Sequence, residues 1–153
     1  MGQYFKAVNL DRREYVCPWC IEGGAKFWEW VANPQGSILA FLLRMSNETG
    51  GGDVPRNDFR IEPVCGPKPD EMYKSLMRPL DDQPDHRRTN YSVVGSWVGD
   101  RIALVGDYDS TELYNHARSF RNISEQLVAE WNQFVDIPER QFRFERCGSC
   151  SSD

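Results

Sequence analysis

The chain has 153 residues, a formal net charge of −5 and a sequence pI near 5.1, so its overall balance is acidic. Nucleic acids and anionic membranes are bound through basic surfaces, and this balance argues against both classes of partner. Hydrophobic residues make up 40% of the chain, which is enough for the core of one globular domain. No apolar run suggests a secretory signal or a membrane span, so we expect a soluble cytoplasmic protein.

The N-terminal part of the chain predicts a hairpin followed by two helices. Polar and apolar side chains alternate over residues 4–10, which predicts a strand, and residues 13–17 are expected to return beside it as a second strand. Helical spacing of apolar residues predicts one helix over 27–33, ended by Pro34, and another over 37–43. The second of these helices is apolar on most sides, so we expect it to be buried.

The rest of the chain predicts a second hairpin and two more helices. Residues 46–90 hold two polar loops, with a short strand and a brief helix between them. A hairpin is expected over 92–106, with its turn at Gly99-Asp100. Helices are then expected over 111–120 and 122–135, and the second of them has asparagine in the capping position.

The order of these elements predicts the fold class. A last strand is expected at residues 142–145, where phenylalanines alternate with charged residues. Strands at both ends and in the middle, with helices between them, predict a single α+β domain over 1–146, built on a mainly antiparallel sheet packed with several helices. A tail rich in cysteine and serine follows over 147–153. First and last strands often lie close together in such sheets, which would bring the two ends of the chain near each other.

Two Cys-x-x-Cys pairs, one near each end, are the sharpest chemical signal in the chain: Cys17 with Cys20, and Cys147 with Cys150. Each pair has the spacing that presents two sulfurs to one ion, and two pairs complete a tetrahedral structural Zn²⁺ site if the ends converge. If they do not converge, each pair is an ordinary reduced dithiol in a cytosolic protein. A thioredoxin-like redox role for the first pair is less favoured, because no βαβ pattern surrounds it. Cys65 has no local partner and is expected to be a small buried apolar residue.

A second candidate site follows the expected strand that ends near Gly106. Asp107, Asp109 and Thr111 form Asp-x-Asp-x-Thr, which is similar to a phosphatase pattern in which the first Asp attacks phosphorus and the second handles the leaving-group proton. That chemistry needs Mg²⁺ and a lysine farther along, and no lysine follows Thr111. The competing interpretation is that Asp109 or Ser110 caps the helix expected at Thr111 and Asp107 orients a turn. A small metal-dependent hydrolase or phosphate-handling enzyme is therefore the alternative function.

The opening residues MGQYFKAVNLD, the central GSWVGDRI and the following GDY carry a resemblance. Together they resemble a family of small uncharacterised proteins that begin MGQY-x-x-x-VN and carry a G-x-W-x-GDRI…GDY core. The resemblance covers most of the chain. The family has no assigned activity, so it transfers no catalytic residue.

The resemblance implies that the central motif is the functional or structural heart of the protein. With the aspartates discussed above, the expected ligand-binding residues are Trp97, Asp100, Arg101, Asp107, Tyr108 and Asp109. The expected hairpin places Asp100 in its turn and the two later aspartates past the far end of its second strand. The carboxylates are thus expected at opposite ends of that strand, which weakens a shared acidic site and favours a turn residue and an ion pair at Asp100 and Arg101.

The sequence as a whole predicts a binding or interaction module, with structural Zn²⁺ as its cofactor where the cysteine pairs meet. Its expected partner is another protein or a second copy of the chain, as a homo-oligomer; nucleic acid and membrane are not expected. Such a module predicts exposed aromatic side chains on one face, with Trp19, Trp28 and Tyr73 as candidates.

Overall fold

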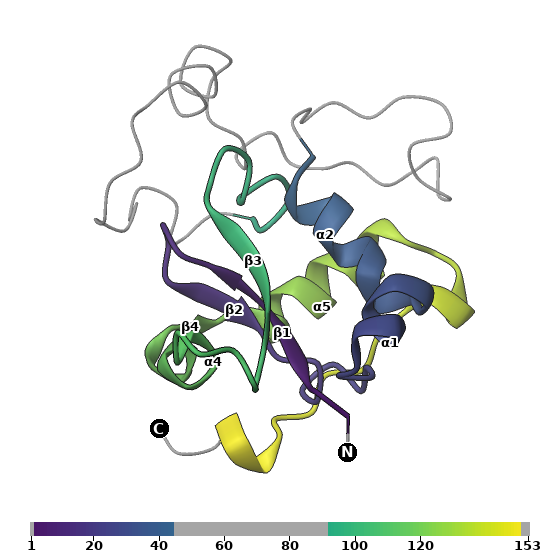
Figure 1. Cartoon of the computed structure of the whole chain (residues 1–153). Coiled ribbons are helices and arrows are strands. Elements are labelled where there is room, and N and C mark those ends of the chain that lie inside the picture. Colours follow the sequence, from purple (N-terminus) through teal and green to yellow (C-terminus); the bar gives the residue numbers. More distant parts are fainter. Residues whose placement is uncertain (1, 45–91, 151–153) are drawn as a thin grey trace.

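The computed structural model describes residues 2–44 and 92–150 (Figure 1). The expectations for residues 46–90, including Cys65 and Tyr73, lie outside the described residues. The described strands form one four-stranded sheet in the order β3-β1-β2-β4. Their bounds are β1 (Phe5–Asn9), β2 (Glu14–Val16), β3 (Ile102–Gly106) and β4 (Arg121–Asn122).

The sheet is mixed and mostly antiparallel, which confirms the predicted α+β class. β1 and β2 form the expected N-terminal hairpin, with Ala7 opposite Val16. β3 pairs antiparallel with the other edge of β1, with Val105 opposite Lys6, and the short β4 runs parallel to β2. Because successive side chains of a strand point to opposite faces of the sheet, each strand contributes residues to both buried faces.

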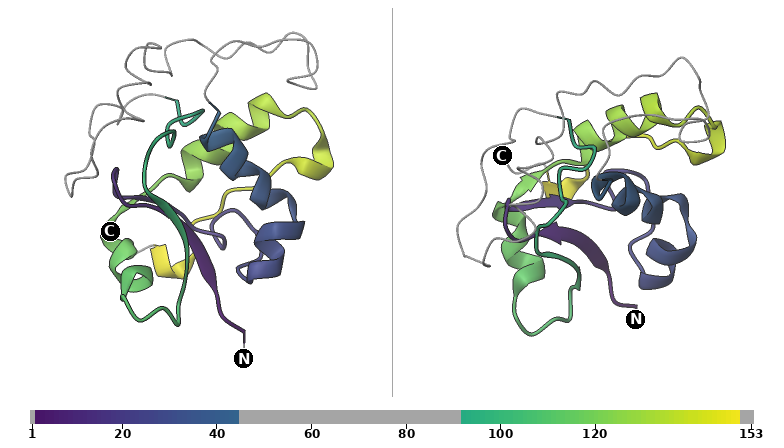
Figure 2. Two further views of the ribbon diagram at one scale, coloured as in Figure 1. Left: turned by 45° about the horizontal axis from the view of Figure 1, so that its top comes forward. Right: turned by 90° about the horizontal axis from the view of Figure 1, so that it is seen from above.

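Helices cover both faces of the sheet (Figures 1 and 2). The helices are α1 (Phe27–Ala32), α2 (Ser37–Leu42), α4 (Leu113–His116) and α5 (Ser124–Phe134). Short 3₁₀ turns lie at Pro34–Gly36, Ala117–Ser119, Pro138–Arg140 and Gly148–Cys150. On one face, Ala7 and Val16 pack with buried residues of α1, α2 and α5, around the fully buried Trp97.

The opposite face of the sheet carries a smaller core. Val8, Tyr15 and Cys17 pack there with Val105 and Tyr114, and the C-terminal cysteines lie against this cluster. The sheet therefore separates a large apolar core from a small cysteine-containing one, and the candidate metal centre belongs to the second.

The expected hairpin over 92–106 is wrong in its first half. Residues 92–99 form successive turns, and β3 pairs with β1 rather than with that segment. The reason lies in where the backbone N–H groups go: those of Gly95 and Trp97 donate to the carbonyls of Phe41 and Leu42 at the end of α2. Gly95 has a positive φ of 64°, which a strand residue does not adopt, and a Cβ there would collide with a backbone carbonyl. The turn therefore requires glycine at this position.

The C-terminal predictions also need correction. The expected strand at 142–145 is extended chain without a strand partner, because Asn132 on α5 occupies the backbone N–H and carbonyl of Phe142 with its side-chain amide. The helix expected over 111–120 is the single turn α4 followed by a 3₁₀ turn. The helix expected over 122–135 is α5, but its N-cap is Ile123 and not Asn122 as predicted. The Asn122 side chain instead accepts from the Ser124 N–H at 3.0 Å, just before the helix.

Candidate metal centre

The first cysteine pair is positioned by the end of β2. Cys17 follows β2 directly, and its backbone N–H donates to the buried Ser124 hydroxyl at the start of α5, at 2.9 Å. The chain then turns back, with the Gly23 N–H donating to the Pro18 carbonyl at 2.8 Å. This turn buries the side chains of both Cys17 and Cys20.

The second pair is brought to the first by the extended C-terminal segment. The Glu145 N–H donates to the carbonyl of Cys20 at 2.8 Å, which ties that segment to the first pair. Cys147 follows two residues after Glu145. Its carbonyl accepts from the Cys150 N–H at 3.0 Å, which closes a 3₁₀ turn. Cys147 and Cys150 are half-buried beside the deeper first pair.

The two pairs converge, as the zinc prediction requires. All four Sγ atoms lie within 4.8 Å of one another, and the Sγ atoms of Cys17 and Cys147 are 3.7 Å apart. Tetrahedral coordination with a Zn–S distance of about 2.3 Å separates the sulfurs by about 3.8 Å. The four cysteines are not joined by disulfides, so four sulfur donors surround one point at the spacing of a tetrathiolate centre.

Polar groups around the cluster are directed at the sulfurs. The Cys20 Sγ accepts from the Cys147 N–H at 3.5 Å and from the Asn122 side-chain amide at 3.7 Å. The Tyr15 hydroxyl lies 3.2 Å from the Sγ of Cys150. Donors of this kind stabilise thiolates and orient metal ligands from the outer shell.

The cysteines differ in acidity. Burial raises the pKa of Cys17 and also that of Cys150, because both would be charged in a desolvated place. Burial acts in the same direction on Cys147, but hydrogen bonds from the neighbouring thiols outweigh it and lower its pKa. In the absence of an ion, Cys17 and Cys150 therefore keep their protons more readily than Cys147 does. A metal that binds the cluster would have to displace those protons.

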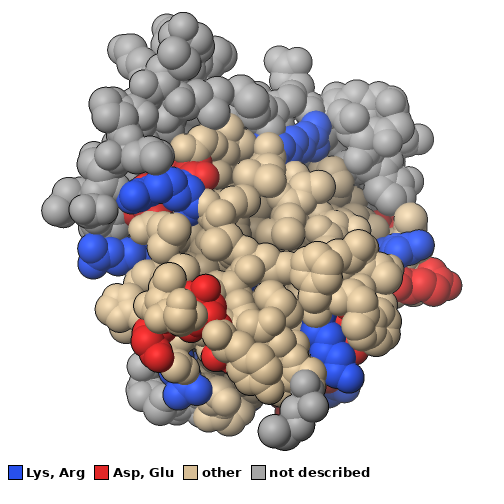
Figure 3. Space-filling view, viewed as in Figure 1, with Lys and Arg blue, Asp and Glu red and all other residues tan. Residues whose placement is uncertain are grey.

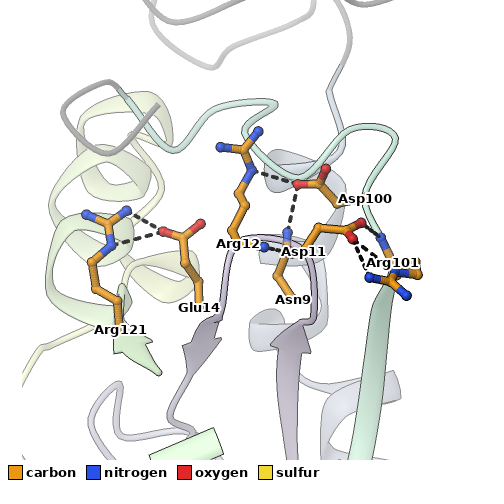
Figure 4. A network of polar contacts seen from close by, with 7 residues as sticks. All are labelled: Asn9, Asp11, Arg12, Glu14, Asp100, Arg101 and Arg121. Atoms are coloured by element: carbon orange, nitrogen blue, oxygen red, sulfur yellow. Dashed lines mark hydrogen bonds and ion pairs between the residues drawn. The ribbon is translucent and has the colours of Figure 1, made fainter. Parts of the chain in front are cut away.

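Two of the predicted ligand-binding residues pair with the β1–β2 turn (Figure 4). The carboxylate of Asp100 accepts from the Arg12 Nε at 2.6 Å and from the Asn9 amide at 2.9 Å. Arg101 donates its backbone N–H and its guanidinium to Asp11, at 2.7 and 2.9 Å. Asp100 and Arg101 thus each form an ion pair, with Arg12 and Asp11 of the β1–β2 turn and not with each other. Asp100 does not lie in a hairpin turn, because β3 pairs with β1.

The remaining predicted ligand residues lie elsewhere. Trp97 is inside the large core, whereas Asp107, Tyr108 and Asp109 follow the opposite end of β3 from Asp100. Asp107 accepts from the Tyr4 N–H at 3.0 Å, and Asp109 accepts from the Thr111 N–H at 2.9 Å. The six residues are thus not gathered at one site, and their ligand-binding role stays a prediction.

Sequence reasoning missed the residues that support the cysteines. Ser124, Asn122, Tyr15 and Lys6 adjoin the cluster or the cavity beside it. Alternation along β2 is the one signal that could have found Tyr15, because it shares a face with Cys17. The others depend on how α5 and β1 pack, which no local pattern encodes.

Replacing Ser124 with alanine is expected to cost about 1–3 kcal/mol of unfolding free energy. The buried Ser124 hydroxyl is the acceptor of the Cys17 N–H, and its loss leaves that donor buried without its partner. Chemical denaturation followed by circular dichroism measures the change. Ser119→Ala is the matched control, because the exposed Ser119 hydroxyl bonds a helical carbonyl near solvent and its loss should cost under about 0.5 kcal/mol. Equal losses in the two variants would contradict the positioning role of Ser124.

Several large aromatic side chains are exposed, among them two of the three that the sequence offers as candidates. Trp28 and Phe27 on α1 are exposed, with Val31 one turn farther along, and Trp19 is exposed between the cysteines of the first pair. Figure 3 shows one face of the molecule on which uncharged residues fill the centre and charged side chains lie towards the periphery.

Comparisons with known proteins add no relative. A scan against protein-family models, a search of curated protein sequences and a search of solved structures each gave no significant match. The family resemblance drawn from the opening residues and the central motif therefore stays a prediction. Within the described residues, every helix is too short or too polar to cross a lipid bilayer.

Proposed function

We propose that this chain is a small binding module whose fold is closed by a structural Zn²⁺ ion held by Cys17, Cys20, Cys147 and Cys150. The observation that carries the proposal is the convergence of four Sγ atoms within 4.8 Å of one another. Four protein ligands leave no open coordination position, which is the arrangement of structural rather than catalytic zinc. The ion would join the end of β2 to the C-terminal segment.

The donor set favours zinc over most other ions. Four thiolates at tetrahedral spacing select Zn²⁺ or iron, whereas Mg²⁺ and Ca²⁺ require oxygen ligands. Zinc undergoes no redox change, which suits a site whose role is to hold two segments together. The outer donors from Asn122 and Tyr15 are compatible with either metal, so the metal's identity belongs to the experiment.

Two observations support a binding module over the alternative hydrolase. The carboxylates of Asp107 and Asp109 accept hydrogen bonds from the backbone N–H groups of Tyr4 and Thr111, as turn residues do, and Glu112 rather than Asp109 is the N-cap of α4. The exposed aromatic side chains on α1 give the molecule an apolar surface of the kind that contacts proteins. The partner that this surface supports is a protein.

Elemental analysis of protein purified without chelator tests the metal. We expect about one zinc per chain, because the four sulfurs surround a single point. Cys147→Ser should lose the zinc, since a hydroxyl replaces one of four thiolates. Ser149→Ala is the matched control: Ser149 is exposed between Cys147 and Cys150, and its variant should keep the zinc. Protein without metal, or iron in place of zinc, would contradict the proposal.

A further inference from the structure

Lys6 in β1 is a cation in an unusual place. Its side chain is almost entirely covered, with the residue only 5% exposed, whereas lysine is rarely buried without a partner. Its Nζ lies 4.0 Å from the centre of the Tyr114 ring and 5.3 Å from that of the Tyr15 ring. Among the described residues, no carboxylate lies within ion-pair distance of this ammonium group. Within the part of the chain that the structure describes, the two rings therefore leave this buried charge without an anion.

The register of the sheet directs Lys6 towards the cysteine cluster. In the β1–β2 pair, Ala7 lies opposite Val16 and Val8 opposite Tyr15. Continued by one residue, the same register places Cys17 opposite Lys6, and residues opposite each other share a face of the sheet. Lys6 also lines one cavity of about 280 Å³ together with Cys17 and Cys150.

The charge of a metal-loaded cluster matches this cation. A Zn²⁺ ion with four thiolates carries two net negative charges, and burying them is costly unless a positive charge lies nearby. Burial lowers the pKa of Lys6, while negative charge on Cys17, Cys150 and Cys147 acts in the opposite direction. The cation and the loaded cluster therefore each reduce the cost of burying the other.

We propose that Lys6 is the buried counter-charge of the zinc tetrathiolate, and that it tunes how tightly this centre holds its metal. The inference rests on the proposed zinc site. Lys6 is a positioning residue in electrostatic terms and is not a ligand. Two other charged residues line the same cavity, Arg118 and Asp107. Arg118 is exposed, so water screens its charge, and Asp107 accepts from the Tyr4 N–H.

The Lys6→Met variant separates charge from packing, because methionine fills similar space without charge. We expect it to bind one zinc per chain with a dissociation constant raised roughly 10–100-fold, measured by competition with a chromophoric chelator. Its metal-free form should melt no lower than the metal-free wild type, because the substitution removes a buried charge that has no anion there. Lys6→Arg should recover most of the affinity, and Arg118→Met, the matched control, should shift it less than about threefold.

Two outcomes would overturn the inference. Lys6→Met could leave the zinc affinity within twofold of wild type, or it could lower zinc affinity and metal-free stability together, as lost packing would. If the metal-free protein is unfolded, its stability cannot be compared, and the zinc affinities of Lys6→Met and Lys6→Arg test the inference by themselves. An arginine variant that fails to restore the zinc affinity would exclude a role for the charge. Wild-type protein without zinc would instead refute the proposed function, and that result is read from the stoichiometry before any Lys6 variant is made.

Discussion

Cys17→Ser is expected to remove most of the folding free energy of this protein. Zinc binding contributes about 10–16 kcal/mol to the folding of small tetrahedral zinc sites at neutral pH, whereas whole domains are stable by about 5–15 kcal/mol. Cys17 is buried beside β2, and its Sγ lies 3.7 Å from that of Cys147 in the second pair. A serine there keeps the backbone bond to Ser124 but supplies a poor zinc ligand.

Thermal unfolding followed by circular dichroism measures this effect, with a chelator as the internal control. Chelator should lower the melting temperature of the wild type towards that of Cys17→Ser and leave the variant unchanged. The two treatments act on one ion, so their effects should not add. A wild-type melting temperature that does not respond to chelator would show that the cluster is stable as four thiols.

Asp100→Ala is expected to cost about 3–5 kcal/mol, the second largest effect. The side chains of Arg12 and Asp100 are only 4% and 0% exposed, and their charged groups meet at 2.6 Å. Removing the carboxylate takes a close ion-pair partner from a buried guanidinium and also an acceptor from the Asn9 amide. The turn between β1 and β2 and the segment before β3 would lose their connection together. Urea denaturation measures the loss.

The same network contains the control for this prediction (Figure 4). Arg121 pairs with Glu14; the Glu14 side chain is 6% exposed, but that of Arg121 is 43% exposed, so Arg121→Ala should cost less than Asp100→Ala, whose partners are both buried. The double variant Arg12→Met with Asp100→Leu should recover part of the loss, because it replaces both charges of the buried pair with apolar side chains. Equal costs for Asp100→Ala and Arg121→Ala would contradict the role of burial.

Local patterns predicted those parts of the fold that local interactions determine. Alternation in residues 4–10 and 13–17 gave the β1–β2 hairpin, because adjacent strands joined by a tight turn need no distant partner. The helices α1, α2 and α5 follow from apolar spacing in the same way. The class of the fold follows from the order of these elements.

The errors occur where a distant segment decides the structure. Alternation alone could not reveal that Gly95 and Trp97 donate their N–H groups to the end of α2, or that β3 pairs with β1. β4 is only two residues long and runs parallel to β2, so it carries no periodic signal. Strand preference depends on the neighbours that a strand meets, which is why these positions escaped prediction.

In the candidate metal centre, too, local spacing predicted some residues, whereas others depend on how distant segments pack. The spacing within each cysteine pair identified the four sulfurs, because two residues between ligands is a local property. Whether the two pairs converge depends on the fold, because it requires the two ends of the chain to lie side by side. Lys6 escaped notice because its position opposite Cys17 follows from the β1–β2 register. Ser124 and Asn122 escaped because they reach the first pair only after α5 has packed.

The bond between the Cys147 N–H and the Cys20 Sγ joins residues 127 positions apart in the chain. Ribosomes add about 5–20 residues per second, so the second pair emerges several seconds after the first. During that interval the chain holds only two of the four sulfurs of the cluster. The cysteine cluster therefore cannot form before the second pair has been synthesised, and a nascent chain that stops before Cys147 never acquires it.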